Sequence, residues 1–251
     1  MPSISIRPVI RALGDVLLPR TCVVCGRPLR VHETCMCVSC ALEMPLTWNW
    51  DLSHHPMADQ LNAHIQARLT SAQPENTAHE PYAYAAALFY YRADFPTGRY
   101  AARMLGERLA ASPLYGKMGG ADLPVDAVVP VPLHWMRRLQ RGYNQAAVIG
   151  KEVADCLGVP MLNLLVRRRR TPTQTHLDAS HRLANVLGAF SLRRRIGTKA
   201  SRDTGLAGLR HILLIDDVFT TGATLAACHA ALREFFPPTV RISTATLGCV
   251  R

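Results

Sequence analysis

The second half of the chain alternates short apolar runs with longer stretches of helical periodicity. Asp126 to Val131 and His211 to Ile215 are rich in Val, Leu and Ile, and they predict two buried strands. Gln145 to Leu157 carries apolar residues at helical spacing between a capping asparagine and a glycine. Gly222 to Phe236 follows the second strand in the same way and ends at two prolines.

Further elements flank this core on both sides. Val240 to Leu247 is Thr-rich and β-branched and predicts a closing strand, whereas Tyr82 to Tyr91 predicts an earlier one. Tyr100 to Ala111 has the spacing of a helix. Strands that alternate with helices predict an α/β fold with a Rossmann-like parallel sheet joined by crossovers.

The N-terminal stretch from Ile4 to Leu18 has amphipathic helical spacing, but charged residues interrupt it, and it is too short for a membrane span. No later stretch reaches the roughly 18 uninterrupted apolar residues that a spanning helix needs. We therefore expect a cytoplasmic protein whose thiols stay reduced.

The charge of the chain is strongly positive, and arginine supplies most of it. The formal net charge of the 251 residues is +11, and the only lysines are Lys117, Lys151 and Lys199. Arginine binds phosphate in a planar, bidentate manner, so the excess favours a phosphate-bearing partner such as a phosphorylated substrate or nucleic acid. Ordinary solubility is the alternative explanation.

A cluster of cysteines marks a small N-terminal module. Two CxxC pairs, Cys22 with Cys25 and Cys37 with Cys40, have the spacing of a tetrahedral zinc site. A segment this short would gain its fold from the metal. The alternative is a set of inert reduced thiols, and Cys35 is a spare that could replace Cys37 as a ligand.

The polar, irregular stretch that follows predicts a connector. It contains prolines and the histidines His54, His55 and His64, which lack partner acids at ligand spacing and which we interpret as loop or surface residues. The predicted organisation is therefore a helix and zinc-ribbon-like module over residues 1–50, a connector over 51–81 and a phosphate-binding α/β domain over 82–251.

The strongest chemical motif joins the second strand to its helix. Asp216 and Asp217 follow an apolar run, at the carboxyl end of a strand, where open α/β sheets bind their ligands. Adjacent carboxylates can accept hydrogen bonds from the vicinal hydroxyls of a ribose. The small-residue turn from Thr220 to Thr224 offers hydroxyls, a glycine and the free amides of a helix N-terminus, which favour a phosphate. The alternative is that Asp217 or Thr221 merely caps the helix.

This strand, acid pair and Thr-rich turn resemble the phosphoribosyl pyrophosphate motif of type I phosphoribosyltransferases. Further segments closely resemble the ComF family, a competence-associated branch of that superfamily. They are Asp126-Ala-Val-Val-Pro-Val-Pro-Leu-His134, Arg141-Gly-Tyr-Asn-Gln145, Arg170-Thr-Pro-Thr-Gln174 and Arg182-Leu-Ala-Asn-Val-Leu-Gly-Ala-Phe190. With the Cys module, the resemblance covers nearly the whole chain.

The resemblance implies a role for each matched segment. Asp216 and Asp217 would bind the ribose, and the turn would bind the 5′-phosphate. One departure is that Arg92 and Arg99 stand where we expect a lysine in such members. The residues expected at the 5′-phosphate are Phe219, Thr220, Thr221, Gly222, Ala223 and Thr224, and those expected at the pyrophosphate and in a closing loop are Pro132, Leu133, His134, Arg137, Arg138, Arg141, Arg170, Thr171, Gln174 and Arg182.

The arginine run Arg167 to Arg169 could equally form a solvated surface or take part in ligand binding.

The resemblance implies a protein that binds phosphoribosyl pyrophosphate with Mg²⁺, carries structural Zn²⁺ and takes part in DNA uptake or utilisation. Two alternatives stay open: a non-catalytic module that binds single-stranded DNA or DNA-uptake proteins, and a phosphoribosyltransferase of nucleotide salvage. No side chain is expected to act as a nucleophile.

Overall fold

The computed structural model describes residues 20–67, 82–91, 98–133, 142–168, 188–193 and 206–250. The chain divides into two compact units, one of residues 1–46 with 92–96 and one of residues 47–91 with 97–251. Among the described helices, none combines the length and apolar character that crossing a membrane requires.

A four-stranded parallel sheet forms the centre of the second unit, in the order β1-β6-β5-β2. The strands are β1 (Ala85–Tyr90), β2 (Ala127–Pro130), β5 (His211–Phe219) and β6 (Arg241–Cys249). Their side chains are buried on both faces, as parallel strands covered by helices require. The predicted α/β parallel sheet is confirmed.

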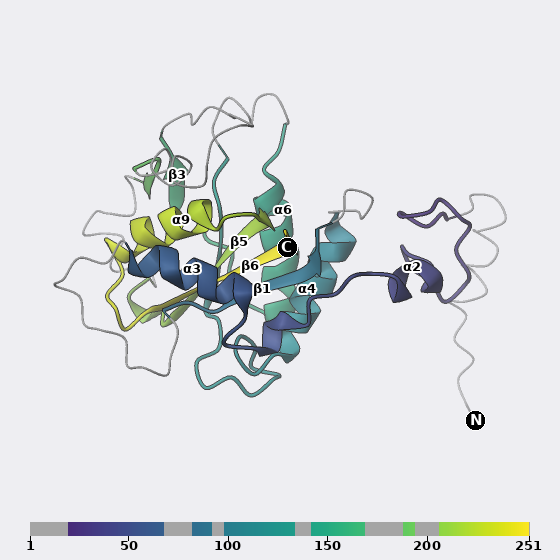
Figure 1. The fold of residues 1–251 in the computed structure, drawn as a ribbon, viewed down its shortest axis with the longest axis horizontal. Helices are drawn as coiled ribbons and strands as arrows, with labels where there is room; N and C mark the ends of the chain where they lie inside the picture. Colours follow the sequence, from purple (N-terminus) through teal and green to yellow (C-terminus); the bar gives the residue numbers. More distant parts are fainter. Residues whose placement is uncertain are drawn as a thin grey trace. The chain divides into compact units, whose positions relative to one another are not determined.

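Helices cover both faces of this sheet (Figure 1). On one face α3 (Pro56–Gln66) packs against α9 (Ala223–Arg233), and on the other α4 (Arg99–Ala111) packs against α6 (Gln145–Leu157). Gly106 allows the second contact to be close, because a Cβ there would lie 2.8 Å from Cβ of Cys156.

Smaller elements complete the two units. A two-stranded antiparallel ribbon pairs β3 (Leu165–Arg167) with β4 (Phe190–Leu192). The 3-10 turns η1 (Asn49–Asp51) and η2 (Leu206–Gly208) lie in the second unit, and the short helix α2 (Val38–Leu42) lies in the first.

Most predicted elements agree with the structure within a few residues, and two details differ. The helix expected to be capped by Asn144 does begin there, but the amide of Asn144 donates to the carbonyl of Val131 (3.0 Å) and makes no cap hydrogen bond. The stretch expected to be a connector contains α3, whose Leu61 and Ile65 are buried in the core.

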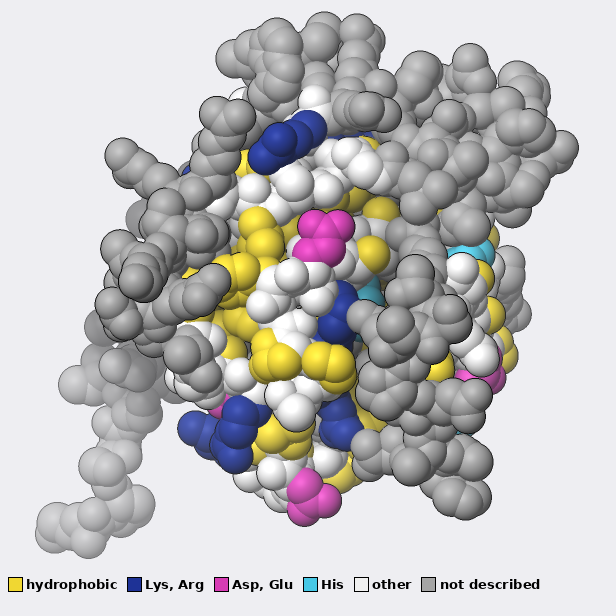
Figure 2. All heavy atoms as spheres, turned by 90° about the vertical axis from the view of Figure 1, so that its left-hand side faces the viewer, with side chains coloured by type: hydrophobic (Ala, Val, Ile, Leu, Met, Phe, Trp, Pro, Cys, Tyr) yellow, Lys and Arg dark blue, Asp and Glu magenta, His cyan; other side chains and the backbone are white. Residues whose placement is uncertain are grey.

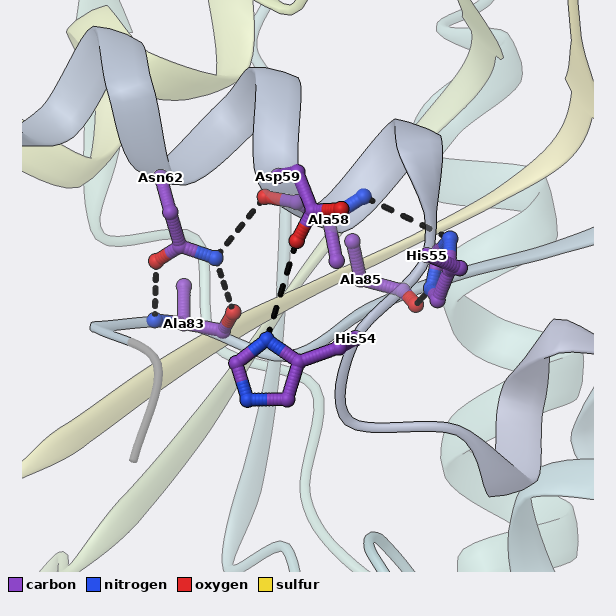
Figure 3. Close-up of polar contacts among 7 residues, drawn as sticks. All are labelled: His54, His55, Ala58, Asp59, Asn62, Ala83 and Ala85. Carbon is purple, nitrogen blue, oxygen red and sulfur yellow. Dashed lines mark hydrogen bonds and ion pairs between the residues drawn. The ribbon is translucent and has the colours of Figure 1, made fainter. Parts of the chain in front are cut away.

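Polar side chains from residues 47–62 cover the outer edge of β1. Figure 3 shows that Asn62 of α3 donates to the carbonyl of Ala83 (2.9 Å) and accepts from its amide (2.9 Å). The ring of His55 bonds to the carbonyl of Ala85 (2.8 Å), and its other nitrogen accepts from the amide of Ala58 at the start of α3 (3.4 Å). His55 therefore has a structural role in helix capping and edge pairing.

We expect Asn62→Ala to destabilise the protein by about 1–3 kcal/mol, because the substitution leaves backbone groups of the β1 edge unsatisfied. Urea unfolding followed by circular dichroism measures the change. Gln60→Ala, at an exposed position of the same helix, is the control and should stay within about 0.5 kcal/mol of the parent. Equal effects of both substitutions would contradict the assigned role of Asn62.

Candidate functional site

The acid pair lies within the central strand, at the point where one of its neighbours leaves the sheet. β5 pairs with β6 as far as Phe219, whereas β2 pairs with it only as far as Ile215. Asp216 and Asp217 are thus part of the strand, and the prediction that the strand ends at Ile215 was wrong. The β6 partner keeps the backbone extended, while β2 pairs with neither acid.

The carboxyl group of Asp216 lies close to that of Asp217 and keeps its proton to a higher pH than a free aspartate does. Oδ1 of Asp216 accepts from the amide of Asp217 (2.9 Å), and Oδ1 of Asp217 accepts from the amide of Val218 (2.8 Å). Burial, and then the charge of Asp217, raise the pKa of Asp216 to about 8. Near neutral pH Asp216 is therefore largely protonated, so its carboxyl can donate a hydrogen bond.

The turn after β5 is shaped by Gly222. This residue has φ +74°, and a Cβ on it would lie 2.8 Å from the Phe219 ring and 3.6 Å from Cδ2 of His64. Glycine is therefore required both by conformation and by space. His64 thus lies near the turn, a position that nothing in its local sequence indicates.

The N-terminus of α9 has no strong side-chain cap. Gly222 is the N-cap residue and makes no side-chain cap hydrogen bond. Oγ1 of Thr221 accepts from the amide of Ala223 at 3.5 Å, at the outer limit of such a bond. The alternative that the acids and threonines serve only as a helix cap is thus poorly supported by these contacts.

A cavity of about 710 Å³ lies where β2 leaves the sheet. Pro132 and Leu133, two residues predicted at the pyrophosphate, line it together with Tyr143 and Asn144 at the start of α6. Four basic side chains and one acidic side chain also line it, which makes it suitable for an anion. They are Arg99, Lys151, Arg167, Arg193 and Glu152.

Arg167 connects the cavity with the acid pair. Its positive charge lowers the pKa of Asp216, although less than burial and Asp217 raise it. Its guanidinium lies over the Phe190 ring, 5.4 Å from the centroid. These contacts favour the ligand-binding interpretation of Arg167. Arg99, found where a lysine was expected, pairs with Glu152 at 3.6 Å.

The other predicted pyrophosphate and loop residues stay predictions, because they lie outside the described residues. They are His134, Arg137, Arg138, Arg141, Arg170, Thr171, Gln174 and Arg182.

The first unit brings four cysteines together. The Sγ atoms of Cys22, Cys25, Cys37 and Cys40 all lie within 4.8 Å of one another, and those of Cys25 and Cys37 are 3.8 Å apart. Four sulfurs at about 2.3 Å from a tetrahedral zinc ion would be about 3.8 Å apart, so the group fits zinc and could hold the ion. Among the described residues, Cys37 rather than Cys35 belongs to this group.

Arg27 supports one side of the cysteine group. Its Nε donates to Sγ of Cys25 (3.3 Å), and this bond lowers the pKa of the Cys25 thiol to about 6. The backbone also contributes, since the amide of Cys37 donates to Sγ of Cys22 (3.4 Å). Such donors favour the thiolate form that metal binding needs.

Comparison with known proteins gives relatives but no matching family model. The chain is 38% identical to "Competence protein F" of Haemophilus influenzae over 43% of its own length and 44% of that protein's. It is 29% identical to "DNA utilization protein YhgH" of Escherichia coli O157:H7 over 88% and 87% of the respective lengths. It is 31% identical to "Competence protein ComFC" of Bacillus subtilis over 43% and 38%. The chain spans less than half the length of the first of these relatives.

Among solved structures, the chain resembles glutamine phosphoribosylpyrophosphate amidotransferase from Bacillus subtilis in complex with ADP and GMP. The sequence identity is 18%, the TM-score is 0.32, and the match covers 59% of this chain and 26% of the other. At these values the likeness adds no argument about ligands.

The strand order, the acid pair in the central strand and the cysteine group together define an α/β protein with a parallel sheet and a small N-terminal cysteine module. The chain is similar to bacterial proteins named for competence and for DNA utilisation.

The raised pKa of Asp216 predicts a pH-dependent stability. In the unfolded chain an aspartate titrates near pH 3.9, so the folded state holds an extra proton between that pH and about 8. The contribution of this proton to the free energy of unfolding is fully present below about pH 4 and is lost as the pH rises to about 8. We expect Asp216→Asn, measured by thermal unfolding, to raise Tm progressively more from pH 5 to pH 9. A constant difference, or one that matches the exposed control Asp122→Asn, would contradict the raised pKa.

For the cysteine group we expect about one zinc ion per chain, as measured by elemental analysis of the purified protein. Cys37→Ser removes one of the four grouped thiols and should abolish stoichiometric zinc. Cys35→Ser, two residues away and outside the group, should retain it. Zinc loss in both variants, or in neither, would overturn the assignment of the four ligands.

Proposed function

We propose that this chain binds phosphoribosyl pyrophosphate with Mg²⁺ at the carboxyl end of β5 and acts in DNA uptake or utilisation. The observation that carries the ligand is the placement of Asp216 and Asp217 beside the open edge of β5, directly before the Gly222 turn and the N-terminus of α9. The hydroxyls of a ribose can form hydrogen bonds with the two acids. Its 5′-phosphate can accept hydrogen bonds from the amides and hydroxyls of the turn.

The charge distribution favours the same ligand. With Asp216 protonated near neutral pH, the acid pair repels a polyanion less than two carboxylates would. The basic cavity beside β2 is lined by Arg167, whose charge acts on Asp216, and the diphosphate of such a ligand would extend into this cavity. Mg²⁺, when bound with the diphosphate, would supply further neutralisation of its charge.

If the chain catalyses transfer, the reaction breaks the bond between C1 of the ribose and the pyrophosphate, and an acceptor nitrogen forms the new bond at C1. The transition state would resemble an oxocarbenium ion, so the protein's contribution is positioning and electrostatic stabilisation. Arg167 and Arg193 of the cavity could stabilise the departing negative charge. We therefore propose a phosphoribosyltransferase activity as the chemistry of this site.

The part in DNA utilisation rests on the relatives, whose names refer to competence and DNA utilisation. The net charge of +11 supports contact with a polyanion. On the face drawn in Figure 2, however, the described Lys and Arg side chains are dispersed among hydrophobic and a few acidic ones. Contact with DNA on that face would thus depend on particular residues. A cytoplasmic location stays a prediction.

Calorimetric titration tests the ligand. We expect phosphoribosyl pyrophosphate with Mg²⁺ to bind the zinc-loaded parent protein, and an Asp216→Asn, Asp217→Asn double variant to lose at least about tenfold in affinity, since each lost hydrogen bond to a charged group is worth roughly 1.5–3 kcal/mol. Asp122→Asn changes an exposed acid that does not line the cavity and serves as the control. A folded parent that binds no ligand would overturn the proposal.

A further inference from the structure

Trp48 has an exposed indole ring and a strained backbone conformation. The residue is 60% exposed, although tryptophan is usually buried. Its backbone is left-handed, at φ 58° and ψ 20°, and among the residues that the structure describes it is the one non-glycine residue with positive φ. That conformation is unfavourable for a residue with a Cβ, so it persists only where the surroundings enforce it.

The residues on both sides of Trp48 enforce it. The amide of Thr47 donates to the carbonyl of Leu88 (3.2 Å), and Oδ1 of Asn49 accepts from the amide of Ala87 (2.9 Å). Both anchors lie on the edge of β1, and Asn49 is itself buried. Trp48 is therefore fixed between two attached residues, and its side chain points away from the core on a rigid support.

A cation lies against the exposed ring. The guanidinium carbon of Arg108, an exposed residue of α4, is 5.5 Å from the ring centroid of Trp48 and 5.6 Å from that of Trp50. The two rings are 5.2 Å apart and inclined at 44°. Trp50 is buried and forms the base of this group, so the exposed surface consists of one indole and one guanidinium.

The neighbouring charges leave Arg108 suited to an anion. Glu107, its neighbour on α4, pairs with Arg103 at 3.1 Å. Asp51 is an exposed acid of η1, so the surroundings are not uniformly basic. A ligand that places one phosphate at Arg108 and one flat ring on Trp48 would match this arrangement better than a purely anionic one would.

We propose that Trp48 and Arg108 form a stacking platform for single-stranded DNA. A base stacks on the exposed indole, and a backbone phosphate binds Arg108. Every base has an aromatic face, so the platform accepts DNA with little preference for sequence. This inference rests on the DNA-handling part of the proposed function and does not depend on phosphoribosyl pyrophosphate.

Fluorescence anisotropy of a labelled oligothymidylate, titrated with the zinc-loaded full chain, tests the platform. Trp48→Gly removes the ring and also relieves the left-handed strain, so this variant should melt no lower than the parent. We expect it to bind DNA about 5- to 150-fold more weakly, the equivalent of about 1–3 kcal/mol for one stacked base. Trp48→Phe keeps an aromatic face and should retain most of the affinity.

Arg108→Gln tests the phosphate contact. We expect it to weaken binding and to reduce the slope of log affinity against log salt concentration by about 0.7, the value for one phosphate contact to a single strand. Met118→Ala changes another exposed apolar residue, 83% exposed, and should bind like the parent.

The outcomes separate this inference from the proposed function. DNA binding by the parent that survives Trp48→Gly would overturn the platform and leave the DNA role standing. Equal losses of DNA affinity in Trp48→Phe and Trp48→Gly would overturn base stacking as the role of the Trp48 ring. A parent that binds no single-stranded DNA would overturn both the platform and the DNA role, while calorimetry with phosphoribosyl pyrophosphate would still decide the ligand site.

Discussion

The pairing of β5 is the constraint on which the candidate site depends. Hydrogen bonds from β6 hold β5 extended through Phe219, while β2 pairs with it only as far as Ile215. This difference in length creates both features of the site. It fixes the two acids in a regular backbone, and it leaves them without a paired residue of β2. The turn at Gly222 then starts α9 from the end of a strand that cannot shift in register, because both faces of the sheet are buried.

The opposite edge of the sheet depends on polar side chains. Thr47, Asn49 and His55 bond to the free edge of β1, and Asn62 bonds to Ala83 just before this strand. All four come from a stretch whose sequence looks like a connector. Each of these residue types favours turns when judged locally, so local patterns cannot identify their partners. The structure shows that they satisfy an exposed strand edge. The same bonds position α3 against α9, which brings His64 close to the Gly222 turn.

The sequence predicted those features that local chemistry determines. Apolar runs and their glycine and proline boundaries gave most strands and helices within a few residues, and the spacing of the two CxxC pairs gave the four grouped cysteines. Features that depend on distant partners were missed. Two adjacent acids resemble the end of a strand, and only the pairing of Asp216 with Thr246 of β6 shows that the strand continues. The position of Arg167 depends likewise on the ribbon of β3 and β4, which no local run of arginines reveals.

Two places in the molecule hold a conformation or a charge that would be unfavourable in isolation. At the acid pair, burial and a like charge oppose the ionisation of Asp216, and the turn that follows requires a left-handed residue. At Trp48, two anchored neighbours hold an ordinary residue in a left-handed backbone and keep its ring exposed. The acid pair lies on the part of β5 that extends beyond its pairing with β2. Trp48 is held at the free edge of β1 in the same sheet. Because the buried strands supply the stability, the fold can keep these groups in arrangements that would not persist in a short isolated peptide.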